Sequence, residues 1–357
     1  MTIDFSFHKP TVNESSAMPK AFFTDPKIYD LEKDSVFRND WIAVARTDQL
    51  NNPGDYLTYD FFGDPILLVC NKQGQINAFS NVCLHRACPI ASGTGNTKTL
   101  FTCPYHKWTY DLEGLFRGAP DMEQAVDFDR DMRLPSLKVE LWQGWVFVNA
   151  SQNPEPLAPT LSELEARLTP WNVADLKTVG VLNYDSPWNW KVLLENFMES
   201  YHHMGPHNET LNPIYPHAGT YAEATNGNYT LLENPTIDET LSPSFWVGLV
   251  FPSMMFAMTR EPGAPVIGWY QMMIKSVDQF ELKIHVLAPQ ALIDSGRAED
   301  AMATFQMIHS EDIPICDGVW QGLQSTRYTP GRLSHLEGCL WHFHDYLQRK
   351  LGTANHN

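Results

Sequence analysis

Between positions 41 and 150, apolar residues occur in short runs that are separated by turn residues. The runs are rich in valine, isoleucine, leucine and phenylalanine, and turn signals lie at positions 52–55, 73–74 and 113–114. The clearest runs are Trp41–Ala45, Ile66–Cys70, Ile76–Phe79, Leu100–Cys103 and Trp145–Val148. This pattern predicts a small antiparallel β domain.

After position 188 the apolar stretches become longer, and helical spacing follows them. The stretches 245–258, 266–274 and 280–287 are rich in Val, Phe, Tyr and Met, which predicts strands of an antiparallel sheet. Apolar residues at helical spacing then predict helices over 298–323 and 333–351. The second half of the chain is therefore expected to pack helices on an antiparallel sheet.

The remaining segments divide the chain into parts. Residues 1–40 are polar and irregular, apart from a helix expected over Ile28–Phe37, which Asp25 and Pro26 would begin. Three prolines between positions 154 and 159 mark a linker. We expect an α+β protein with an N-terminal arm at 1–40, a β domain at 41–150 and a second domain at 151–357.

Residues 189–207 predict an amphipathic helix with polar groups on an inward face. Gly205 and Pro206 should end or bend this helix just before His207. His202 and His207 are five residues apart, one more than a straight helix aligns, so the bend would let both imidazoles converge. Two histidines and a carboxylate form a centre with open positions that suits iron(II). A surface helix that carries a few histidines would show the same pattern.

Composition narrows the functional classes. The chain has 357 residues, enough for roughly two domains, and its 43% hydrophobic content can form sizeable cores. A net charge of −17 disfavours binding to nucleic acid or to anionic membranes, because both attract positive charge. Neither a signal peptide nor a membrane-spanning stretch is evident, so we expect a cytoplasmic protein. The six cysteines are too few and too irregular for a disulfide scaffold.

Two short loops in the β domain carry a second set of ligand types. Cys83 and His85 form one pair, and Cys103 and His106 form the other. Such a set can hold a structural zinc, or a [2Fe-2S] cluster in which histidines replace two cysteines on one iron. Each loop contributes one cysteine and one histidine, which favours the cluster, although the spacing does not rule out zinc.

These motifs together resemble the large (α) subunit of the Rieske non-haem iron oxygenases. The resemblance rests on Cys83-Leu-His85-Arg86, on the segment from Cys103 to Tyr110, and on the run from Asn189 to His207. Both motifs occur in the order found in that family, and the resemblance covers the chain from about position 41 to its end. It implies a Rieske domain at 41–150 and a catalytic mononuclear iron domain at 151–357.

The resemblance also implies roles for single residues. It supplies Asp312 as the third ligand of the iron that His202 and His207 would hold, although the sequence alone does not distinguish Asp312 from Glu311 or Asp317. Glu199 stands where most members have an Asp that bridges to a cluster histidine of the neighbouring subunit. Asn196, one turn away, is expected to hydrogen-bond at the iron site.

Two residues of the cluster loops depart from the family's pattern. Ala87 and Lys107 stand where family members usually have glycine. Both positions bear on the conformation of the loops, and hydrogen bonds and exposure around a cluster tune its potential.

The implied activity is that of a terminal oxygenase component. Electrons would pass through the Rieske cluster to a mononuclear Fe(II) site, where O2 would hydroxylate or demethylate a small organic substrate. The chain lacks nucleotide-binding and plant-type ferredoxin motifs, so electrons from NAD(P)H would arrive through a separate ferredoxin or reductase. A homotrimer is expected from the family, and no nucleic acid or membrane partner is expected.

The sequence leaves alternatives open both for the substrate and for the class of activity. The Glu at position 199 and the segment after Pro330 favour a methylated or quaternary amine over an aromatic ring. A ring hydroxylase, a dioxygenase or an O-demethylase of the same family is the alternative. Outside oxygenase chemistry, the chain could be a Rieske electron-transfer protein, which would hold cluster iron alone, or a zinc-stabilised binding module, which would be colourless.

Overall fold

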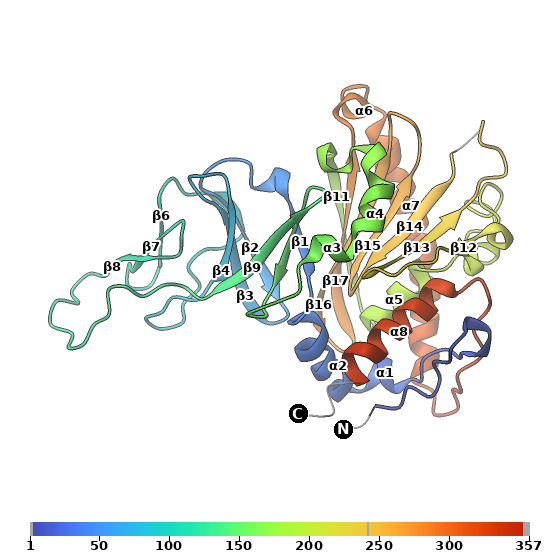
Figure 1. Cartoon of the computed structure of the whole chain (residues 1–357), viewed down its shortest axis with the longest axis horizontal. Helices are drawn as coiled ribbons and strands as arrows, with labels where there is room; N and C mark the ends of the chain where they lie inside the picture. The colour runs from blue at the N-terminus through green and yellow to red at the C-terminus, as the bar shows by residue number, and fades with distance from the viewer. Residues whose placement is uncertain (1–2, 241–242, 353–357) are drawn as a thin grey trace. The chain divides into compact units, whose positions relative to one another are not determined.

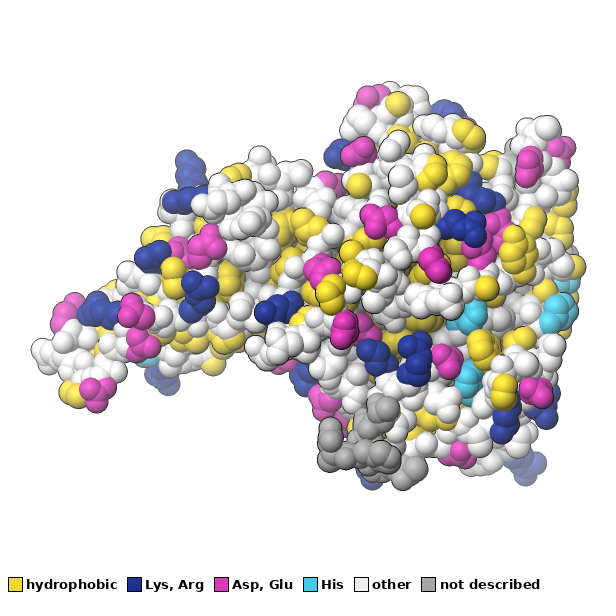
Figure 2. All heavy atoms as spheres, viewed as in Figure 1, with side chains coloured by type: hydrophobic (Ala, Val, Ile, Leu, Met, Phe, Trp, Pro, Cys, Tyr) yellow, Lys and Arg dark blue, Asp and Glu magenta, His cyan; other side chains and the backbone are white. Residues whose placement is uncertain are grey.

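The computed structural model describes residues 3–240 and 243–352, and these form two compact units. Trp41–Glu155 forms one unit, and the described residues before and after it form the other. The boundary at Glu155 lies inside the proline-rich segment. Along the described residues, no helix is long and apolar enough to cross a membrane. Figure 2 shows acidic and basic side chains interspersed over the visible face.

The 41–155 unit is built on antiparallel strands (Figure 1). Seven strands form a sheet in the order β1-β10-β9-β4-β3-β2-β5, and three short strands form the sheet β6-β7-β8. The strands of the larger sheet are β1 (Ile42–Arg46), β2 (Asp55–Phe61), β3 (Asp64–Cys70), β4 (Ile76–Ser80), β5 (Thr94–Asn96), β9 (Ser136–Trp142) and β10 (Trp145–Asn149). Those of the smaller sheet are β6 (Leu100–Thr102), β7 (Thr109–Asp111) and β8 (Phe116–Gly118).

The other unit is organised around a second antiparallel sheet of seven strands, in the order β11-β17-β16-β15-β14-β13-β12. These strands are β11 (Lys177–Ser186), β12 (Tyr221–Ala222), β13 (Tyr229–Asn234), β14 (Phe245–Val250), β15 (Met254–Thr259), β16 (Val266–Ser276) and β17 (Gln279–Ala288). Alternate residues of β14, β15 and β16 lie on one face of the sheet. Phe245, Val247, Ala257 and Tyr270 from this face line a cavity that is described below.

Helices cover this sheet and bring the C-terminal part of the chain to the same cavity. Phe305 of the long helix α7 lies against β16 at Gly268, where any side chain would clash with the Phe305 ring. The glycine thus permits the close approach of helix and sheet. The helices of this unit are α1 (Ala21–Thr24), α2 (Pro26–Glu32), α3 (Leu157–Thr160), α4 (Ser162–Leu168), α5 (Trp190–Phe197), α6 (Gln290–Asp294), α7 (Ala298–Leu323) and α8 (Gly338–Gly352).

The α+β class is confirmed, and most predicted elements are present. Helix α7 has the predicted bounds, 298–323, whereas α8 begins at Gly338, five residues later than predicted. The apolar stretch 245–258 forms two paired strands, β14 and β15, instead of one. Asp25 accepts a hydrogen bond from the Lys27 backbone N–H and caps α2, as its position predicted. Strand β11 and the helices α3 and α4 were not predicted.

The helix prediction over 189–207 is wrong beyond Phe197. Helix α5 ends at Phe197, and a separate 3-10 turn, η6 (Tyr201–Met204), follows. The side chain of Glu199, which lies before this turn, accepts a hydrogen bond from the backbone N–H of His202 within the turn at 2.9 Å. The chain therefore changes direction before His202, not only at Gly205 and Pro206.

A buried ion pair fixes the start of helix α5. Lys191 Nζ lies 2.7 Å from Glu32 Oε1, and both side chains have zero exposure. Glu32 also accepts a hydrogen bond from the Trp190 indole N–H at 3.0 Å. Burial lowers the pKa of Lys191, and the charge of Glu32 opposes this shift. The N-terminal segment thus holds the helix that leads into the site.

We expect Lys191→Met to lower the free energy of unfolding by about 3–5 kcal/mol, because it leaves the Glu32 charge buried without a partner. The double variant Glu32→Gln/Lys191→Met should recover most of this loss, since neither charge remains. Urea unfolding of the wild type and both variants measures the difference. Equal stability of the single and double variants would contradict this role for the pair.

Candidate functional site

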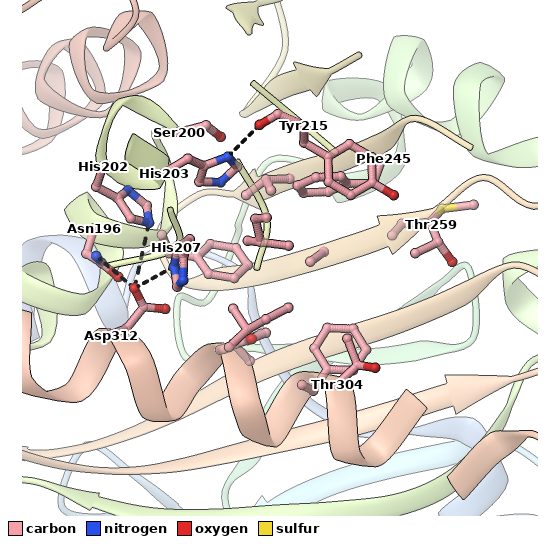
Figure 3. Close-up of a pocket in the computed structure, with 18 of the residues that line it drawn as sticks. Asn196, Ser200, His202, His203, His207, Tyr215, Phe245, Thr259, Thr304 and Asp312 are labelled. Carbon is pink, nitrogen blue, oxygen red and sulfur yellow. Dashed lines mark hydrogen bonds and ion pairs between the residues drawn. The ribbon is translucent and has the colours of Figure 1, made fainter. Parts of the chain in front are cut away.

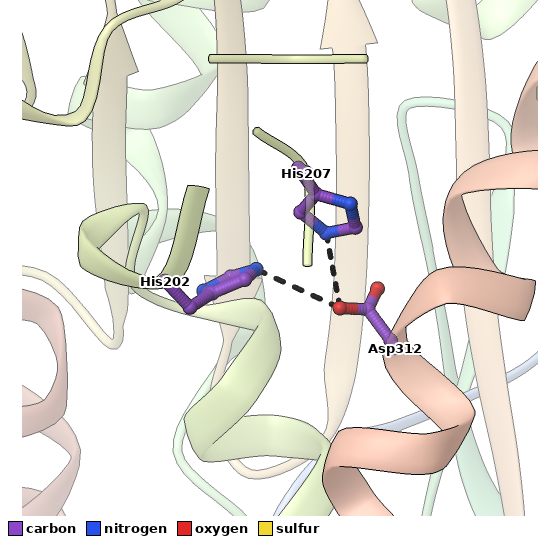
Figure 4. Close-up of side chains that lie close together, drawn as sticks. All are labelled: His202, His207 and Asp312. Atoms are coloured by element: carbon purple, nitrogen blue, oxygen red, sulfur yellow. Dashed lines mark ion pairs between the residues drawn. The ribbon is translucent and has the colours of Figure 1, made fainter. Parts of the chain in front are cut away.

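Two histidines and an aspartate converge in the larger unit (Figure 4). One ligand atom from each of His202, His207 and Asp312 lies within 4.8 Å of the others. His207 Nε2 is 3.0 Å from Asp312 Oδ1, and His202 Nε2 is 3.6 Å from the same oxygen. His202 belongs to η6, His207 follows Gly205 and Pro206, and Asp312 lies on α7. The turn region that carries the two histidines and the distant helix α7 thus supply one ligand set of the kind that iron(II) binds.

Each of these histidines is oriented by a second carboxylate. His202 Nδ1 lies 2.7 Å from Glu199 Oε1, and His207 Nδ1 lies 2.6 Å from Glu311 Oε2. Glu311 also accepts a hydrogen bond from the Thr210 hydroxyl at 2.8 Å. When a carboxylate accepts the proton on Nδ1, the lone pair of Nε2 is free to bind a metal ion. Such carboxylate partners strengthen metal binding. Both Nε2 atoms face Asp312 as this requires.

The protonation of the site suits a cation. Burial alone would raise the pKa of Asp312, but the hydrogen bond and charge of His207 lower it below its usual value. Burial likewise opposes the charged form of His207, yet its contacts with Asp312 and Glu311 raise the pKa of this histidine. In this arrangement His207 and Asp312 favour each other's charged forms, so a metal ion that takes the place of the proton finds an ionised aspartate.

Two further residues, Asn196 and His203, lie beside the site, and only Asn196 was predicted to form a hydrogen bond there. The side-chain amide of Asn196 donates to Asp312 Oδ1 at 3.3 Å. His203 points elsewhere, because its Nδ1 lies 3.0 Å from the Tyr215 carbonyl oxygen. Burial lowers the pKa of His203 to about 3, so its imidazole is neutral.

The ligand set opens into an apolar cavity of about 240 Å³ (Figure 3). The residues of the ligand set lie at one end of the cavity, and Thr259 and Thr304 lie at the other. Aromatic and aliphatic side chains form most of the wall between them; these include Phe197, Leu211, Tyr215, Phe245, Val247, Tyr270, Phe305 and Ile308. Such a cavity can hold a small organic molecule beside the ligand set.

The predicted cluster ligands lie together in the 41–155 unit. The side chains of Cys83 and Cys103 are buried, whereas His85 and His106 are half-buried, with ring centroids 4.5 Å apart. His85 Nδ1 is a buried atom that has no hydrogen-bond partner among the described residues. An unpaired buried nitrogen is costly unless it binds a metal. Two inner thiols and two outer imidazoles fit a cluster with cysteines on one iron and histidines on the other.

The two departures from the family pattern lie at the turns of these loops. Ala87 has φ 56° and Lys107 has φ 60°, the left-handed region that glycine favours. Their backbone N–H groups donate to the carbonyl oxygens of Cys83 and Cys103, which closes both loops. The loops therefore keep a conformation suited to glycine although they carry other residues.

Sequence reasoning missed three residues of these sites. Glu311 was considered as a ligand but not as the partner of His207, a role that depends on which way α7 faces. Tyr110 places its hydroxyl 3.4 Å from Cys83 Sγ, and Trp108 stacks on His85 with ring centroids 4.7 Å apart. Both aromatic residues belong to the motif that begins at Cys103, which was the available signal.

Comparison with protein families gives two matches. Residues 40–138 match the Rieske [2Fe-2S] domain, and residues 173–236 and 239–353 match the ring hydroxylating alpha subunit (catalytic domain). The second match alone covers half of the chain. Each match contains one of the two candidate ligand sets.

Curated relatives share part of this chain. It is 34% identical to the carnitine monooxygenase oxygenase subunit of Acinetobacter pittii, over 60% of this chain and 58% of the relative. It is 33% identical to the glycine betaine monooxygenase oxygenase subunit of Chromohalobacter salexigens, over 57% of this chain and 46% of the relative. The matched region thus spans about half the length of these relatives.

Solved structures match almost the whole chain. The quaternary ammonium Rieske monooxygenase CntA in complex with L-carnitine aligns with a TM-score of 0.84 and 25% identity, covering 98% of this chain and 99% of that one. A naphthalene 1,2-dioxygenase aligns with a TM-score of 0.79 and 17% identity, covering 96% and 93%, which shows a shared fold.

The contact between Glu311 and His207 yields a test. We expect Glu311→Ala to weaken Fe(II) binding by roughly 10–100-fold, because His207 loses the group that orients it. Anaerobic competition with a chromophoric chelator measures the affinity. Asp317→Ala, which removes a carboxylate from an exposed position on the same helix, is the matched control. Equal affinity of the two variants would contradict the orienting role.

His309 makes stability depend on pH. It is buried one turn before Asp312, against the Tyr184 ring at 4.4 Å, and neither of its ring nitrogens has a partner among the described residues. Burial lowers its pKa to about 4, so the folded chain resists a proton that the unfolded chain accepts below about 6.5. The folded state therefore loses stability as the pH falls from 6.5 towards 4.

We expect His309→Phe to reduce this loss by up to about 3 kcal/mol, because phenylalanine does not titrate. Urea unfolding of the wild type and the variant between pH 4 and pH 8 measures how the free energy of unfolding changes with pH. His335→Gln, at an exposed position, is the control. The idea fails if the His309→Phe variant keeps the wild-type dependence on pH.

Proposed function

Because this chain belongs to the Rieske non-haem iron oxygenases, as an α subunit, we propose that it is a terminal oxygenase component. It would use O2 to hydroxylate or demethylate a small organic substrate. The observation that carries the proposal is the convergence of His202, His207 and Asp312 at one end of an apolar cavity.

We propose that His202, His207 and Asp312 hold a mononuclear Fe(II), and that Cys83, His85, Cys103 and His106 hold a Rieske [2Fe-2S] cluster. When bound, the cluster supplies single electrons and the iron supplies the chemistry of dioxygen. The chain's own residues then have separate tasks. Glu199 and Glu311 hold the Nδ1 protons of the two histidines, and Asn196 steadies Asp312.

The cavity would place the substrate and exclude water. Its apolar wall replaces the solvent around a bound molecule, which protects the reaction from side reactions with water. Buried rings such as Tyr270 and Phe245 give the cavity a fixed shape. The carbon that reacts would lie at the end where the three ligand residues are.

We propose a methylated amine as the substrate. The names of the relatives support this choice, because they are monooxygenases of carnitine, of glycine betaine and, in Amaranthus tricolor, of choline. Oxidation of an aromatic ring or O-demethylation is the alternative within the family. The similarity to naphthalene dioxygenase is a similarity of fold and does not support an aromatic substrate for this chain.

We propose that the chain works as a homotrimer with a separate electron donor, a ferredoxin or a reductase that draws on NAD(P)H. A solved CntA structure is described as giving insight into inter-subunit electron transfer, which supports an arrangement of this kind. In such an assembly Glu199 would lie between the iron site of one chain and the cluster site of its neighbour.

Metal content and oxygen uptake of the reconstituted, chemically reduced chain test the oxygenase proposal. The wild type should hold one iron beyond the two of the cluster and should consume O2 when a methylated amine is present. Asp312→Ala should keep the colour of the cluster but lose the additional iron and reduce uptake to background, while Asp317→Ala should behave as wild type. Wild-type protein with cluster iron alone would indicate an electron carrier, and colourless protein would indicate a zinc-stabilised module.

A mixed assembly tests the trimer. Asp312→Ala and Cys83→Ser should each be inactive, because each lacks one of the two sites. Co-expressed in one assembly, the two variants should regain part of the oxygen uptake, since an intact iron site can then neighbour an intact cluster site. Absence of any recovery would contradict transfer between chains.

A further inference from the structure

Tyr270 combines deep burial with a hydroxyl group that has no partner. It belongs to strand β16, lines the cavity beside the candidate ligand set, and is only 3% exposed. Its hydroxyl forms no hydrogen bond with any residue that the structure describes. Unlike the ring nitrogens of His309, which are fully enclosed, this unpaired oxygen is not sealed within protein atoms, so a ligand can reach it from the cavity. Buried polar groups are normally paired, and a ligand that brings an acceptor would pair this one.

The other buried hydroxyl groups of the cavity wall already donate their protons inside the protein. Ser200 donates to Asn234 Oδ1 at 2.6 Å, and Tyr215 donates to the Pro243 carbonyl oxygen at 3.0 Å. The two threonines of the wall are not buried, so water can serve their hydroxyl groups. A hydroxyl has one proton to donate. Within the described part of the wall, Tyr270 therefore holds the buried hydroxyl proton that is free for a ligand.

Neighbouring rings hold Tyr270 in place near the ligand set. Its ring centroid lies 4.5 Å from that of Phe197 and 6.4 Å from that of Phe305, and both neighbours line the cavity. It also lies 6.2 Å from the ring of His309, which is one turn before Asp312 on α7. Burial, and next the charge of Asp312, raise the pKa of the Tyr270 phenol. The phenol therefore keeps its proton at neutral pH and acts as a donor with a fixed position.

We propose that Tyr270 donates a hydrogen bond to an oxygen atom in the tail of the substrate and so sets the position of the methyl groups relative to the three ligand residues. This inference rests on the proposed oxygenase function, and it narrows the substrate to a methylated amine whose tail carries an oxygen acceptor, a hydroxyl or a carboxylate. A quaternary or protonated nitrogen has no free lone pair, so the amine itself cannot accept the proton. A hydrocarbon tail would leave the phenol without a partner.

Two pairs of ligands test the proposal, each with an oxygen-bearing member and a hydrocarbon counterpart of similar shape. The first pair is choline and trimethyl(propyl)ammonium, and the second is γ-butyrobetaine and trimethyl(4-methylpentyl)ammonium. Calorimetry on the iron-loaded chain without oxygen gives the ratio of the two Kd values in each pair. Tyr270→Phe should shift this ratio by roughly 10-fold against the oxygen-bearing member in at least one pair, because phenylalanine cannot donate. The pair with the larger shift identifies the acceptor as a hydroxyl or a carboxylate.

Tyr215→Phe is the matched control, because it removes from the same wall a hydroxyl that is already bonded to the Pro243 carbonyl oxygen. This variant should keep the wild-type ratio in both pairs. The proposal is overturned if Tyr270→Phe leaves both ratios unchanged, if Tyr215→Phe shifts them equally, or if the wild type binds none of the four ligands.

The stability of the ligand-free chain provides an independent test. Tyr270→Phe keeps the ring between Phe197 and Phe305 and removes only an unpaired hydroxyl, so urea unfolding should show no loss of stability. Tyr215→Phe should lower the urea midpoint, since it leaves the Pro243 carbonyl oxygen without its donor. An equal loss in Tyr270→Phe would show that its hydroxyl has a partner inside the protein and would overturn the proposal.

Oxygen uptake by the reduced chain with the same four ligands separates this inference from the proposed function. Wild type should consume O2 faster with an oxygen-bearing ligand than with its hydrocarbon counterpart, and Tyr270→Phe should lose this difference. The same difference in both proteins would overturn the inference and leave the oxygenase function in place. Uptake with none of the ligands would count against the oxygenase function, while the ratios of the Kd values would still decide the role of Tyr270.

Discussion

The site depends on one constraint, which is that two imidazoles must present the same nitrogen to one carboxylate. His202 and His207 meet it because Glu199 and Glu311 hold their Nδ1 atoms at 2.7 and 2.6 Å, so that both Nε2 atoms face Asp312. The break after Phe197, the pairing of Lys191 with Glu32, and the close approach of α7 to the sheet all serve this geometry. Without Glu199 and Glu311 the imidazole rings could rotate, and the three ligand atoms would no longer point to one position.

The acidic residues and the apolar residues of the cavity wall come from different segments. Glu199 and Asp312 lie with the two histidines, because Glu199 contacts His202 and Asp312 contacts His207. Most of the remaining wall is aromatic and aliphatic, and strands β14, β15 and β16 and the first turns of α7 supply much of it. Residues of this apolar part can therefore differ without a change in the three candidate ligands.

The fold class and the candidate ligands could be predicted from local patterns along the chain. The α+β class and the bounds of α7 followed from apolar periodicity, because burial on one face imposes a fixed spacing on a strand or a helix. The pairs Cys83/His85 and Cys103/His106 were found because each lies within one short loop. For the same reason His202 and His207 were recognised as a possible pair, since five residues separate them.

Contacts between groups that are far apart along the chain became visible only once the chain was folded. Helical spacing favoured a continuous helix to Gly205, but the side chain of Glu199 bonds to the backbone of a separate turn, a contact that periodicity does not encode. The pairing of Glu311 with His207 depends on the orientation of α7 against the sheet. That orientation is set by packing between segments about 100 residues apart, so no local pattern in the sequence contains it.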